Sequence, residues 1–440
     1  MSIVQEIRTR ALTQLRGALL VASVVLGALA LHAPAQAASV AVPGEVLIEL
    51  ESSALLPGLL ARYPVVVIDQ FGSRPIYRLK VDPAADLHHL IEALDVEIGV
   101  RAAEPNFLHG SPEARRNVAW ALGDPAAYTT QWAPQTLRLD QAHRFARGAG
   151  VRVAVLDSGV DVQHSALAGK LLPGFDFVDL DNDPSEVGDA TAAGFGHGTF
   201  VAGLVSLVAP DAQIMPLRVL DSDGVGNAWV LGQAMLYAVD PDGDPTTDDG
   251  AQVINLSLGS PERTHILDTI AKVVSCAEPD LDEPEEARND PGFANDKLRC
   301  ARTGGAVIAA AAGNSATDRT REYPAAEGAY GLMAVAASSA DDRLAPFSNF
   351  GSWVHLAAPG EGISSSIPGG QYATWRGTSM AAPMVAGTAA LLRSLDPLLV
   401  PDQVVERLRR SSAPLCGTAI RRIDALAVLS NEAPEALVCR

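Results

Sequence analysis

The sequence is short of basic side chains, aromatic residues and cysteines. Its 440 residues include 33 Lys and Arg against 52 Asp and Glu, which gives a formal net charge of -19. A nucleic-acid binder that follows phosphates needs a basic face, so this balance argues against that class of partner. Aromatic residues make up only 5% of the chain, but hydrophobic residues together reach 48%, which is ample for a large core. A chain of this length indicates two or three domains.

Only four cysteines occur, Cys276, Cys300, Cys416 and Cys439. The chain contains no Cys-x-x-Cys pair of the kind that binds zinc, which argues against a zinc site. Four cysteines allow three pairings. The two pairs that are close in sequence each close a short loop, which is worth roughly 3 kcal/mol in the chain-entropy model. We therefore favour disulfides that join the first cysteine to the second and the third to the fourth.

The N-terminus has the three parts of a secretory signal peptide. Residues 1–16 carry three arginines, residues 18–31 form an apolar run, and Ala35-Gln36-Ala37 is a small-x-small cleavage site. The run is shorter than the roughly 20 residues that a membrane-spanning helix needs. We expect cleavage after Ala37, no membrane anchor, and an exported protein, extracellular or periplasmic, in a compartment that permits disulfides.

Residues 38–110 have the pattern of a small domain of their own. Strand, helix, strand, strand, helix and strand are expected in turn at residues 45–51, 54–62, 64–71, 75–81, 82–93 and 96–104. This order is typical of the ferredoxin-like α+β fold, or split βαβ. Residues 111–130 contain two prolines and the dibasic pair Arg115-Arg116, and we interpret them as a linker.

Buried strands alternate with helices from residue 131 to 440. Strands are expected at residues 151–156, 213–219, 252–256, 306–310, 332–336 and 353–356. Their continuous apolar character indicates a mainly parallel central sheet with helices on both faces, an α/β fold. Chemistry in such sheets gathers at the carboxyl ends of the strands. Two acidic stretches, 240–250 and 276–300, are interpreted as surface loops.

Four polar side chains stand at the expected ends of these elements. Asp157 ends a strand in a Ser-Gly turn, and His197 lies between glycines at the start of an apolar helix. Asn314 follows a buried strand, and Ser379 lies in the first turn of another apolar helix. Each alone has an ordinary explanation as a turn or capping residue. Together they supply the nucleophile, general base, orienting carboxylate and oxyanion donor that acyl transfer needs.

The segments that carry these residues resemble those of the subtilase family, the subtilisin-like serine peptidases. They are VAVLDSGVD, GHGTFVAGL, AAAGNS and GTSMAAP, and the likeness extends over about residues 131–440. The resemblance implies that Ser379 attacks the scissile carbonyl, that His197 transfers its proton and that Asp157 orients the imidazole. It also implies that Asn314 binds the oxyanion.

The resemblance further implies how substrates and the small N-terminal domain bind. A peptide would add as a strand between Gly224-Val225-Gly226 and Ser257-Leu258-Gly259. Residues 38–110 are similar to the family's propeptide, which covers the active site until it is removed, here by self-cleavage between about His109 and Tyr128. We therefore expect a monomeric, self-processing serine endopeptidase, with peptides or proteins as substrates and its own propeptide as inhibitor.

This chemistry requires no cofactor. Asp240, Asp242 and Asp244 alternate like the start of a calcium loop, and four aspartates between residues 176 and 183 form a second cluster. Solvated acidic loops account better for both clusters, and bound structural calcium is the alternative. Two other functions stay open. One is a secreted calcium-dependent binding protein on an inactive peptidase fold, against which the complete triad argues. The other is a nucleotide-binding enzyme on a doubly wound sheet, against which the absence of a Gly-rich phosphate loop after a first strand argues.

Overall fold

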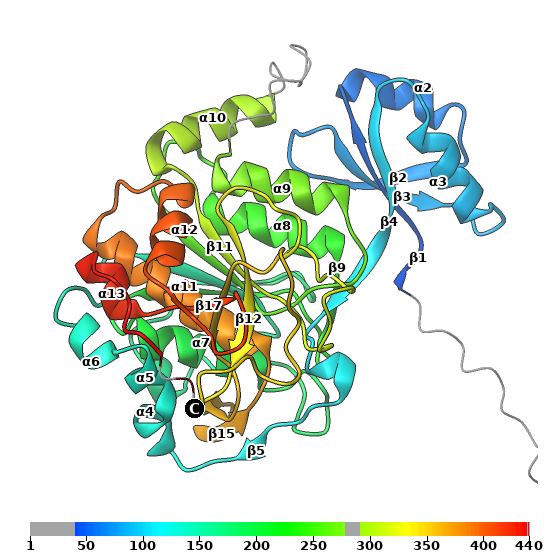
Figure 1. Ribbon diagram of the computed structural model, residues 1–440. Coiled ribbons are helices and arrows are strands. Elements are labelled where there is room, and N and C mark those ends of the chain that lie inside the picture. The colour runs from blue at the N-terminus through cyan, green and yellow to red at the C-terminus, as the bar shows by residue number, and fades with distance from the viewer. Residues whose placement is uncertain (1–39, 278–290, 438, 440) are drawn as a thin grey trace, which may run out of the picture. The chain divides into compact units, whose positions relative to one another are not determined.

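The computed structural model describes residues 40–277, 291–437 and 439, and from residue 41 onward the chain forms one unit (Figure 1). The expected signal peptide, residues 1–37, lies outside the described residues.

The N-terminal domain has the element order that the sequence predicts. Its elements are β1 (Ala41–Leu50), η1 (Ser53–Leu55), α2 (Leu56–Leu60), β2 (Val65–Gln70), β3 (Ile76–Val81), α3 (Leu87–Asp95) and β4 (Val100–Gly110). The strands are antiparallel in the order β2-β3-β1-β4. This is the strand order of a ferredoxin-like sheet, so the predicted α+β domain is confirmed.

The second half of strand β1 is buried on both faces because its side chains alternate between two cores. Val46, Ile48 and Leu50 pack with α2 and α3 inside the N-terminal domain. Leu47, on the opposite face, belongs to a core cluster of the larger domain. The N-terminal domain is therefore packed against the larger domain through its sheet.

Strand β4 is longer than expected, because the sequence pattern predicted a strand only to residue 104. The structure extends it to Gly110, and residues 108–110 pair antiparallel with β9 (Val225–Asn227) of the larger domain. The pairing partner of this extension lies more than a hundred residues away, so the local pattern of the N-terminal domain could not predict it.

A nine-stranded sheet forms the centre of the larger domain, in the order β16-β17-β13-β12-β11-β10-β6-β8-β7. Its neighbours are parallel except for β16 and β17. The strands are β6 (Arg152–Asp157), β7 (Phe175–Asp176), β8 (Gln213–Arg218), β10 (Val253–Leu256), β11 (Val307–Ala311), β12 (Leu332–Ser338), β13 (Leu356–Pro359), β16 (Ala413–Pro414) and β17 (Arg421–Arg422). The predicted mainly parallel α/β sheet is confirmed.

One strand prediction is shifted. A strand was expected over residues 353–356, but β13 begins at Leu356. Trp353 lies instead in a turn that the Val354 N–H closes on the Gly351 carbonyl at 3.2 Å. A buried tryptophan satisfies a strand pattern and a tight turn equally well.

Helices cover both faces of the sheet. Along β6, Val153 and Val155 pack into one core with α7 (His197–Val208) and α11 (Thr378–Leu395). Ala154 and Leu156 pack into the other with α8 (Ala228–Val239) and α9 (His265–Ser275). Other helices that the structure describes after residue 126 are α4 (Ala127–Thr130), α5 (Trp132–Thr136), α6 (Leu139–Ala142), η3 (Ser165–Leu167), α10 (Pro291–Thr303), α12 (Pro401–Arg410) and α13 (Ala425–Ser430).

Residues 111–130, interpreted as a linker, are ordered against the larger domain. They contain η2 (Ala114–Arg116) and β5 (Ala121–Leu122), and β5 joins a small sheet with β14 (Ile363–Ile367) and β15 (Gln371–Trp375). Residues 111–113 are buried. This segment is therefore part of the packed structure.

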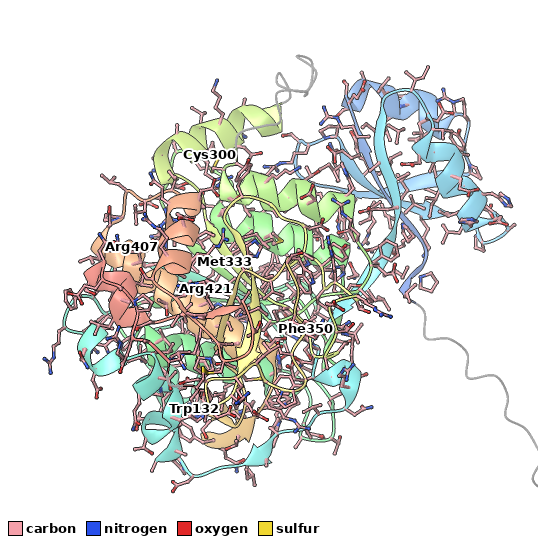
Figure 2. All side chains as sticks on the ribbon, viewed as in Figure 1. Trp132, Cys300, Met333, Phe350, Arg407 and Arg421 are labelled. Atoms are coloured by element: carbon pink, nitrogen blue, oxygen red, sulfur yellow. A yellow bond between two sulfur atoms is a disulfide. The ribbon has the colours of Figure 1, made fainter. Side chains whose placement is uncertain are left out.

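Both disulfides join cysteines that are close in sequence, Cys276 to Cys300 and Cys416 to Cys439, as the sequence favoured (Cys300 is labelled in Figure 2). The stretch 276–300 is only partly the loop that its acidic composition suggested, because α10 begins at Pro291. Tertiary contacts support this helix: the buried Arg299 donates a hydrogen bond to the Val273 carbonyl at 2.6 Å. Within the described parts of the chain, no helix has both the length and the apolar character to cross a membrane.

Candidate active site

Asp157 is the last residue of β6, at the carboxyl edge of the central sheet. Its Oδ1 accepts a hydrogen bond from the Ser158 N–H at 2.8 Å and lies 2.6 Å from His197 Nδ1. Both side chains are fully buried. Asp157 is therefore placed to hold the imidazole in a fixed orientation through its Nδ1 edge.

His197 is the first residue of α7, an apolar helix that fills the core. The preceding Gly196 has a φ of 87°, a left-handed conformation that favours glycine and lets the chain turn sharply into the helix. The ring of Trp375 packs edge-on against the imidazole, with 5.4 Å between the ring centroids. The other ring nitrogen, Nε2, faces the carboxylate of Glu113, whose Oε2 lies 3.2 Å away.

Ser379 is the second residue of α11, and the helix begins directly after Gly377. The Ser379 hydroxyl lies 2.6 Å from the carboxylate of Glu113 and 3.1 Å from the Ser257 carbonyl oxygen. A Cβ atom at position 377 would come within 1.6 Å of Glu113 Oε1. Glycine is thus required for the close approach of this carboxylate.

Asn314 follows β11 and faces the same carboxylate. Its Nδ2 donates to Glu113 Oε1 at 2.7 Å. Its Oδ1 accepts hydrogen bonds from the backbone N–H of Thr378 at 2.9 Å and from the Thr378 hydroxyl at 3.0 Å. The two bonds from Thr378 fix the amide so that its N–H group points to the space beside Ser379.

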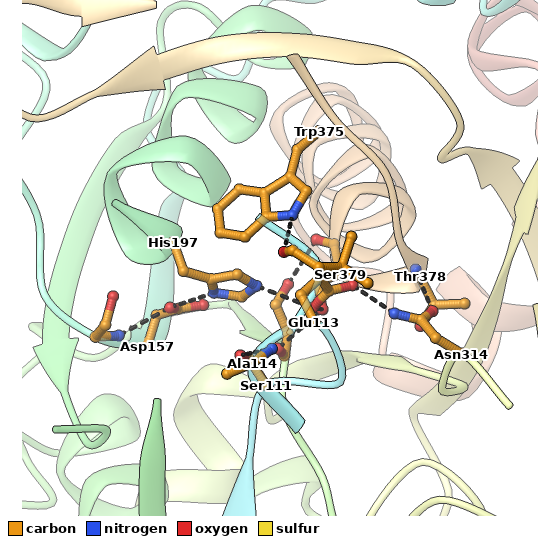
Figure 3. Close-up of polar contacts among 12 residues, drawn as sticks. Ser111, Glu113, Ala114, Asp157, His197, Asn314, Trp375, Thr378 and Ser379 are labelled. Carbon is orange, nitrogen blue, oxygen red and sulfur yellow. Dashed lines mark hydrogen bonds and ion pairs between the residues drawn. The ribbon is translucent and has the colours of Figure 1, made fainter. Parts of the chain in front are cut away.

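Glu113 occupies the centre of this arrangement, and the sequence patterns did not identify it. Figure 3 shows its carboxylate between the imidazole of His197, the hydroxyl of Ser379 and the amide of Asn314. Its Oε2 lies 3.2 Å from His197 Nε2. The acidic side chain comes from the segment that follows β4. No family segment and no local periodicity mark it.

The pKa values of the two partners are shifted by this contact. Burial alone would raise the pKa of the Glu113 carboxyl, but its three hydrogen-bond donors outweigh burial and hold the pKa below its usual value. Burial alone would lower the pKa of the His197 ring, but the two carboxylates beside it raise the pKa to about 10. In this form the imidazole is therefore charged at neutral pH and cannot accept a proton.

The two predicted substrate-binding segments lie on either side of the end of β4. His109 and Gly110 pair with Gly226 and Val225 on β9. On the other side, the Gly110 N–H donates to the Gly259 carbonyl at 2.9 Å, and the Gly259 N–H donates back at 3.0 Å. Residues 108–110 thus lie as an added strand between the two segments.

A further carboxylate, that of the half-buried Glu186, lies at the start of the helix that carries His197, and the sequence patterns missed it as well. It accepts hydrogen bonds from the N–H groups of Gly196 at 2.7 Å and Thr199 at 3.2 Å, in the first turn of α7. It also accepts one from the hydroxyl of Ser158, next to Asp157, at 2.9 Å. Burial raises the pKa of Glu186 to about 8, against the opposing effect of these hydrogen bonds. A carboxyl ahead of a helix start is a common sequence feature, so it gave no distinct signal.

The acidic clusters differ from the pattern that the sequence suggested. Asp240, Asp242 and Asp249 place one carboxylate oxygen each within 4.8 Å of one another. Asp244, which the sequence grouped with the first two, instead accepts a hydrogen bond from the Thr246 hydroxyl at 2.6 Å. This cluster is exposed or half-buried, as solvated loops are.

In the second cluster an arginine side chain neutralises two of the carboxylates, as a bound metal ion would. Arg218 Nη1 lies 2.5 Å from carboxylate oxygens of both Asp176 and Asp179. Two of the four aspartates are therefore already paired with a positive charge.

Comparisons with known proteins identify families and relatives that the chain resembles. A sequence model described as the subtilase family matches residues 148–429, and one described as the fervidolysin N-terminal prodomain matches residues 31–106. The chain is 35% identical over 328 residues to a thermophilic serine proteinase of Bacillus sp. (strain AK1), covering 72% of this chain and 69% of that protein. It is 36% identical over 281 residues to thermitase of Thermoactinomyces vulgaris, covering 62% of this chain and 85% of that protein.

A solved structure shows the same fold. It is that of fervidolysin from Fervidobacterium pennivorans, described as a keratinolytic enzyme related to subtilisin, with a TM-score of 0.67 and 22% sequence identity. The match covers 90% of this chain, which spans 62% of that chain.

Proposed function

Because the chain belongs to the subtilase family, as a subtilisin-like serine peptidase with an N-terminal prodomain, we propose that it is an exported endopeptidase made as a self-processing zymogen. In this proposal residues 1–37 are the signal peptide and residues 38–110 the propeptide. Residues 111–130 form the maturation region, and residues 131–440 form the peptidase domain. Peptides and proteins are its substrates.

The proposed mechanism assigns one role to each polar side chain of the site. Ser379 attacks the scissile carbonyl, and His197 accepts the hydroxyl proton and returns it to the leaving amine. Asp157, 2.6 Å from Nδ1, holds the ring and stabilises its charged form. Asn314 and the backbone N–H of Ser379 donate to the oxyanion, at a helix N-terminus that favours negative charge.

The observation that carries this proposal is the position of the Glu113 carboxylate. One of its oxygens bonds to the proposed nucleophile and lies beside the proposed base, and the other accepts from the proposed oxyanion donor. A negatively charged oxygen bound by these groups resembles the tetrahedral intermediate in its charge. The same groups would stabilise the oxyanion of a peptide substrate.

The same contact supports the zymogen part of the proposal. Residues 108–110 fill the strand position of a substrate, and Glu113 then fills the position of the reacting carbonyl. The carbonyl oxygens of Ser111 and Glu113 accept hydrogen bonds within the turn, from the N–H groups of Arg115 and Arg116 at 3.2 and 3.1 Å. The uncut chain therefore blocks the site with a side-chain carboxylate. This group contains no peptide bond, so the enzyme cannot cleave it.

Expression of the full chain beside a Ser379→Ala variant tests the proposal. The parent is expected to separate into propeptide and peptidase and to hydrolyse casein. The variant is expected to stay uncut and inactive, yet to be trimmed to one product of the mature size when a trace of active parent is added, whereas an unfolded chain would be degraded to small fragments. A parent that stays uncut and hydrolyses no protein substrate would overturn the proposal.

A further inference from the structure

Glu322 is a buried acid beside the proposed catalytic centre, and the proposed mechanism does not use it. It lies between β11 and β12, and its side chain is 4% exposed. A Cβ atom at Gly259 would meet Glu322 Cγ at 2.7 Å, and one at Gly313 would meet Glu322 Oε2 at 2.7 Å. The carboxylate therefore lies against both a substrate-binding segment and the residue before Asn314.

This position is next to the bond that the enzyme would cut. Gly110 is bonded to Gly259, and the Ser379 hydroxyl lies 3.1 Å from the carbonyl oxygen of Ser257, two residues before Gly259. A peptide extended beyond Gly110 rises about 3.3 Å per residue and so reaches Ser379 within two residues. The residue that presents its carbonyl there has its side chain near the wall formed by Gly259, Gly313 and Glu322.

A cation already occupies this wall in the uncut chain. The guanidinium of Arg115 donates a hydrogen bond to Glu322 Oε1. Burial raises the pKa of Glu322, and the charges of Arg115 and Arg116 oppose that shift. Both arginines belong to the segment 111–130, and their removal on maturation would leave a buried carboxylate without these charges. An unpaired buried carboxylate is costly, so a cationic side chain is a favourable ligand for it.

We propose that Glu322 makes the enzyme selective for Lys or Arg in the residue before the scissile bond, with Arg115 as the occupant of this pocket in the uncut chain. This inference rests on the proposed peptidase function and names its substrate class. An arginine can donate two parallel hydrogen bonds to a carboxylate, and a lysine supplies a single point charge. Apolar side chains offer this carboxyl neither a hydrogen bond nor a charge.

A series of fluorogenic peptides tests the proposal on the self-processed full chain. The peptides are identical except for Arg, Lys, Gln, Leu or Glu before the scissile bond. We expect kcat/KM for Arg and Lys to exceed that for Gln and Leu on the order of 10- to 100-fold, the worth of one charge-assisted hydrogen bond. Equal rates for Leu and Arg would overturn the proposal. Hydrolysis of none of the peptides or of casein would instead count against the peptidase function itself.

Variants separate this pocket from a general effect of negative charge. Glu322→Gln is expected to lower kcat/KM for the Arg peptide by the same factor and to leave the Leu peptide unchanged or faster. Asp318→Asn removes an exposed charge four residues earlier and is expected to keep the preference. If both variants lose the preference equally, or neither does, Glu322 is not the selecting residue.

A second measurement needs no variant, in case Glu322→Gln fails to fold. Benzamidine, a small planar cation, is expected to inhibit the parent competitively. Benzamide, its uncharged counterpart, is expected to be at least tenfold weaker, because it lacks the charge-assisted hydrogen bond. Equal inhibition by the two compounds would overturn the proposal.

Discussion

The hydroxyl of Ser379 donates a hydrogen bond to the carboxylate of Glu113 at 2.6 Å, across 266 residues of sequence. The same carboxylate oxygen lies 3.2 Å from His197 Nε2. An acid from the proposed maturation region therefore separates the proposed nucleophile from its base. The proposed self-processing would have to break this contact before any peptide carbonyl reached the site.

Removal of the Glu113 carboxylate is expected to speed self-processing. In a Glu113→Ala variant, Ser379 and His197 can meet directly, and the pKa of His197 falls because one of its two carboxylate neighbours is lost. We expect the half-life of the precursor to shorten roughly tenfold or more, as followed by gel electrophoresis. Asp124→Asn is the control, because it removes an exposed charge from the same segment. A Glu113→Ala precursor as long-lived as the parent would show that the carboxylate is no barrier.

The stability of the uncut protein is expected to fall at alkaline pH. The pKa of His197 is raised from 6.5 to about 10, so its contribution is fully present below pH 6.5 and is lost as the pH rises through about 10. The facing groups are Asp157 and Glu113, and Glu186 lies near Asp157. Thermal unfolding of a Ser379→Ala precursor between pH 6.5 and 10 measures this slope.

A matched variant identifies the source of that slope. Burial raises the pKa of Glu186 to about 8, so this group also lowers the stability as the pH rises to about 8. Adding Glu113→Gln to Ser379→Ala is expected to flatten the slope only by the part that belongs to the His197 contact. An unchanged slope would assign the whole effect to other groups.

Much of this site is predictable from local sequence because its residues stand at the ends of regular elements. Asp157 ends a continuous apolar strand, Asn314 follows another, and His197 and Ser379 lie in the first turns of apolar helices. Strand and helix periodicity sets the places of such ends, and parallel strands bring them to one edge. The fold class followed from the same periodicity.

The acidic side chains of the site were not predictable, since their partners are distant in sequence. Glu113 bonds to Asn314 across 201 residues, and Arg115 bonds to Glu322 across 207. Neither pair has a local pattern, and the extension of β4 depends likewise on β9. Contacts that form only when a prodomain docks leave no periodic trace in either partner.

Glu186 is expected to act as a positioning residue for His197. Glu186→Ala leaves the N–H groups of Gly196 and Thr199 and the Ser158 hydroxyl without their acceptor, so the first turn of α7 loosens. We expect kcat to fall roughly 10- to 100-fold with KM nearly unchanged, because the peptide-binding strands are not touched.

The isosteric variant distinguishes this role from simple destabilisation. Burial raises the pKa of Glu186 to about 8, and Glu186→Gln keeps the shape of the side chain and one oxygen acceptor for these donors. Glu186→Gln is expected to keep most of the activity at pH 7, and its pH profile should lack any step near pH 8 that the parent shows. Equal loss in both variants, or a loss in KM alone, would contradict a positioning role.

A Gly232→Ala substitution is expected to weaken docking of the prodomain before maturation and to stabilise the mature enzyme. Phe71 of the prodomain stacks on Trp229 of α8 with 3.9 Å between ring centroids, and a Cβ atom at Gly232 would lie 2.8 Å from Phe71 Cζ. The three atoms nearest to that Cβ position all belong to Phe71. In Gly232→Ala the methyl group therefore opposes docking of the prodomain, whereas in the mature enzyme it stabilises the helix by up to about 1 kcal/mol.

In this variant, activity is expected to emerge sooner after self-cleavage, together with a higher Tm of the mature enzyme. Phe71→Leu is the matched control, since it should hasten release and leave the mature Tm unchanged. If Gly232→Ala slows the emergence of activity, Phe71 does not hold the prodomain at this helix.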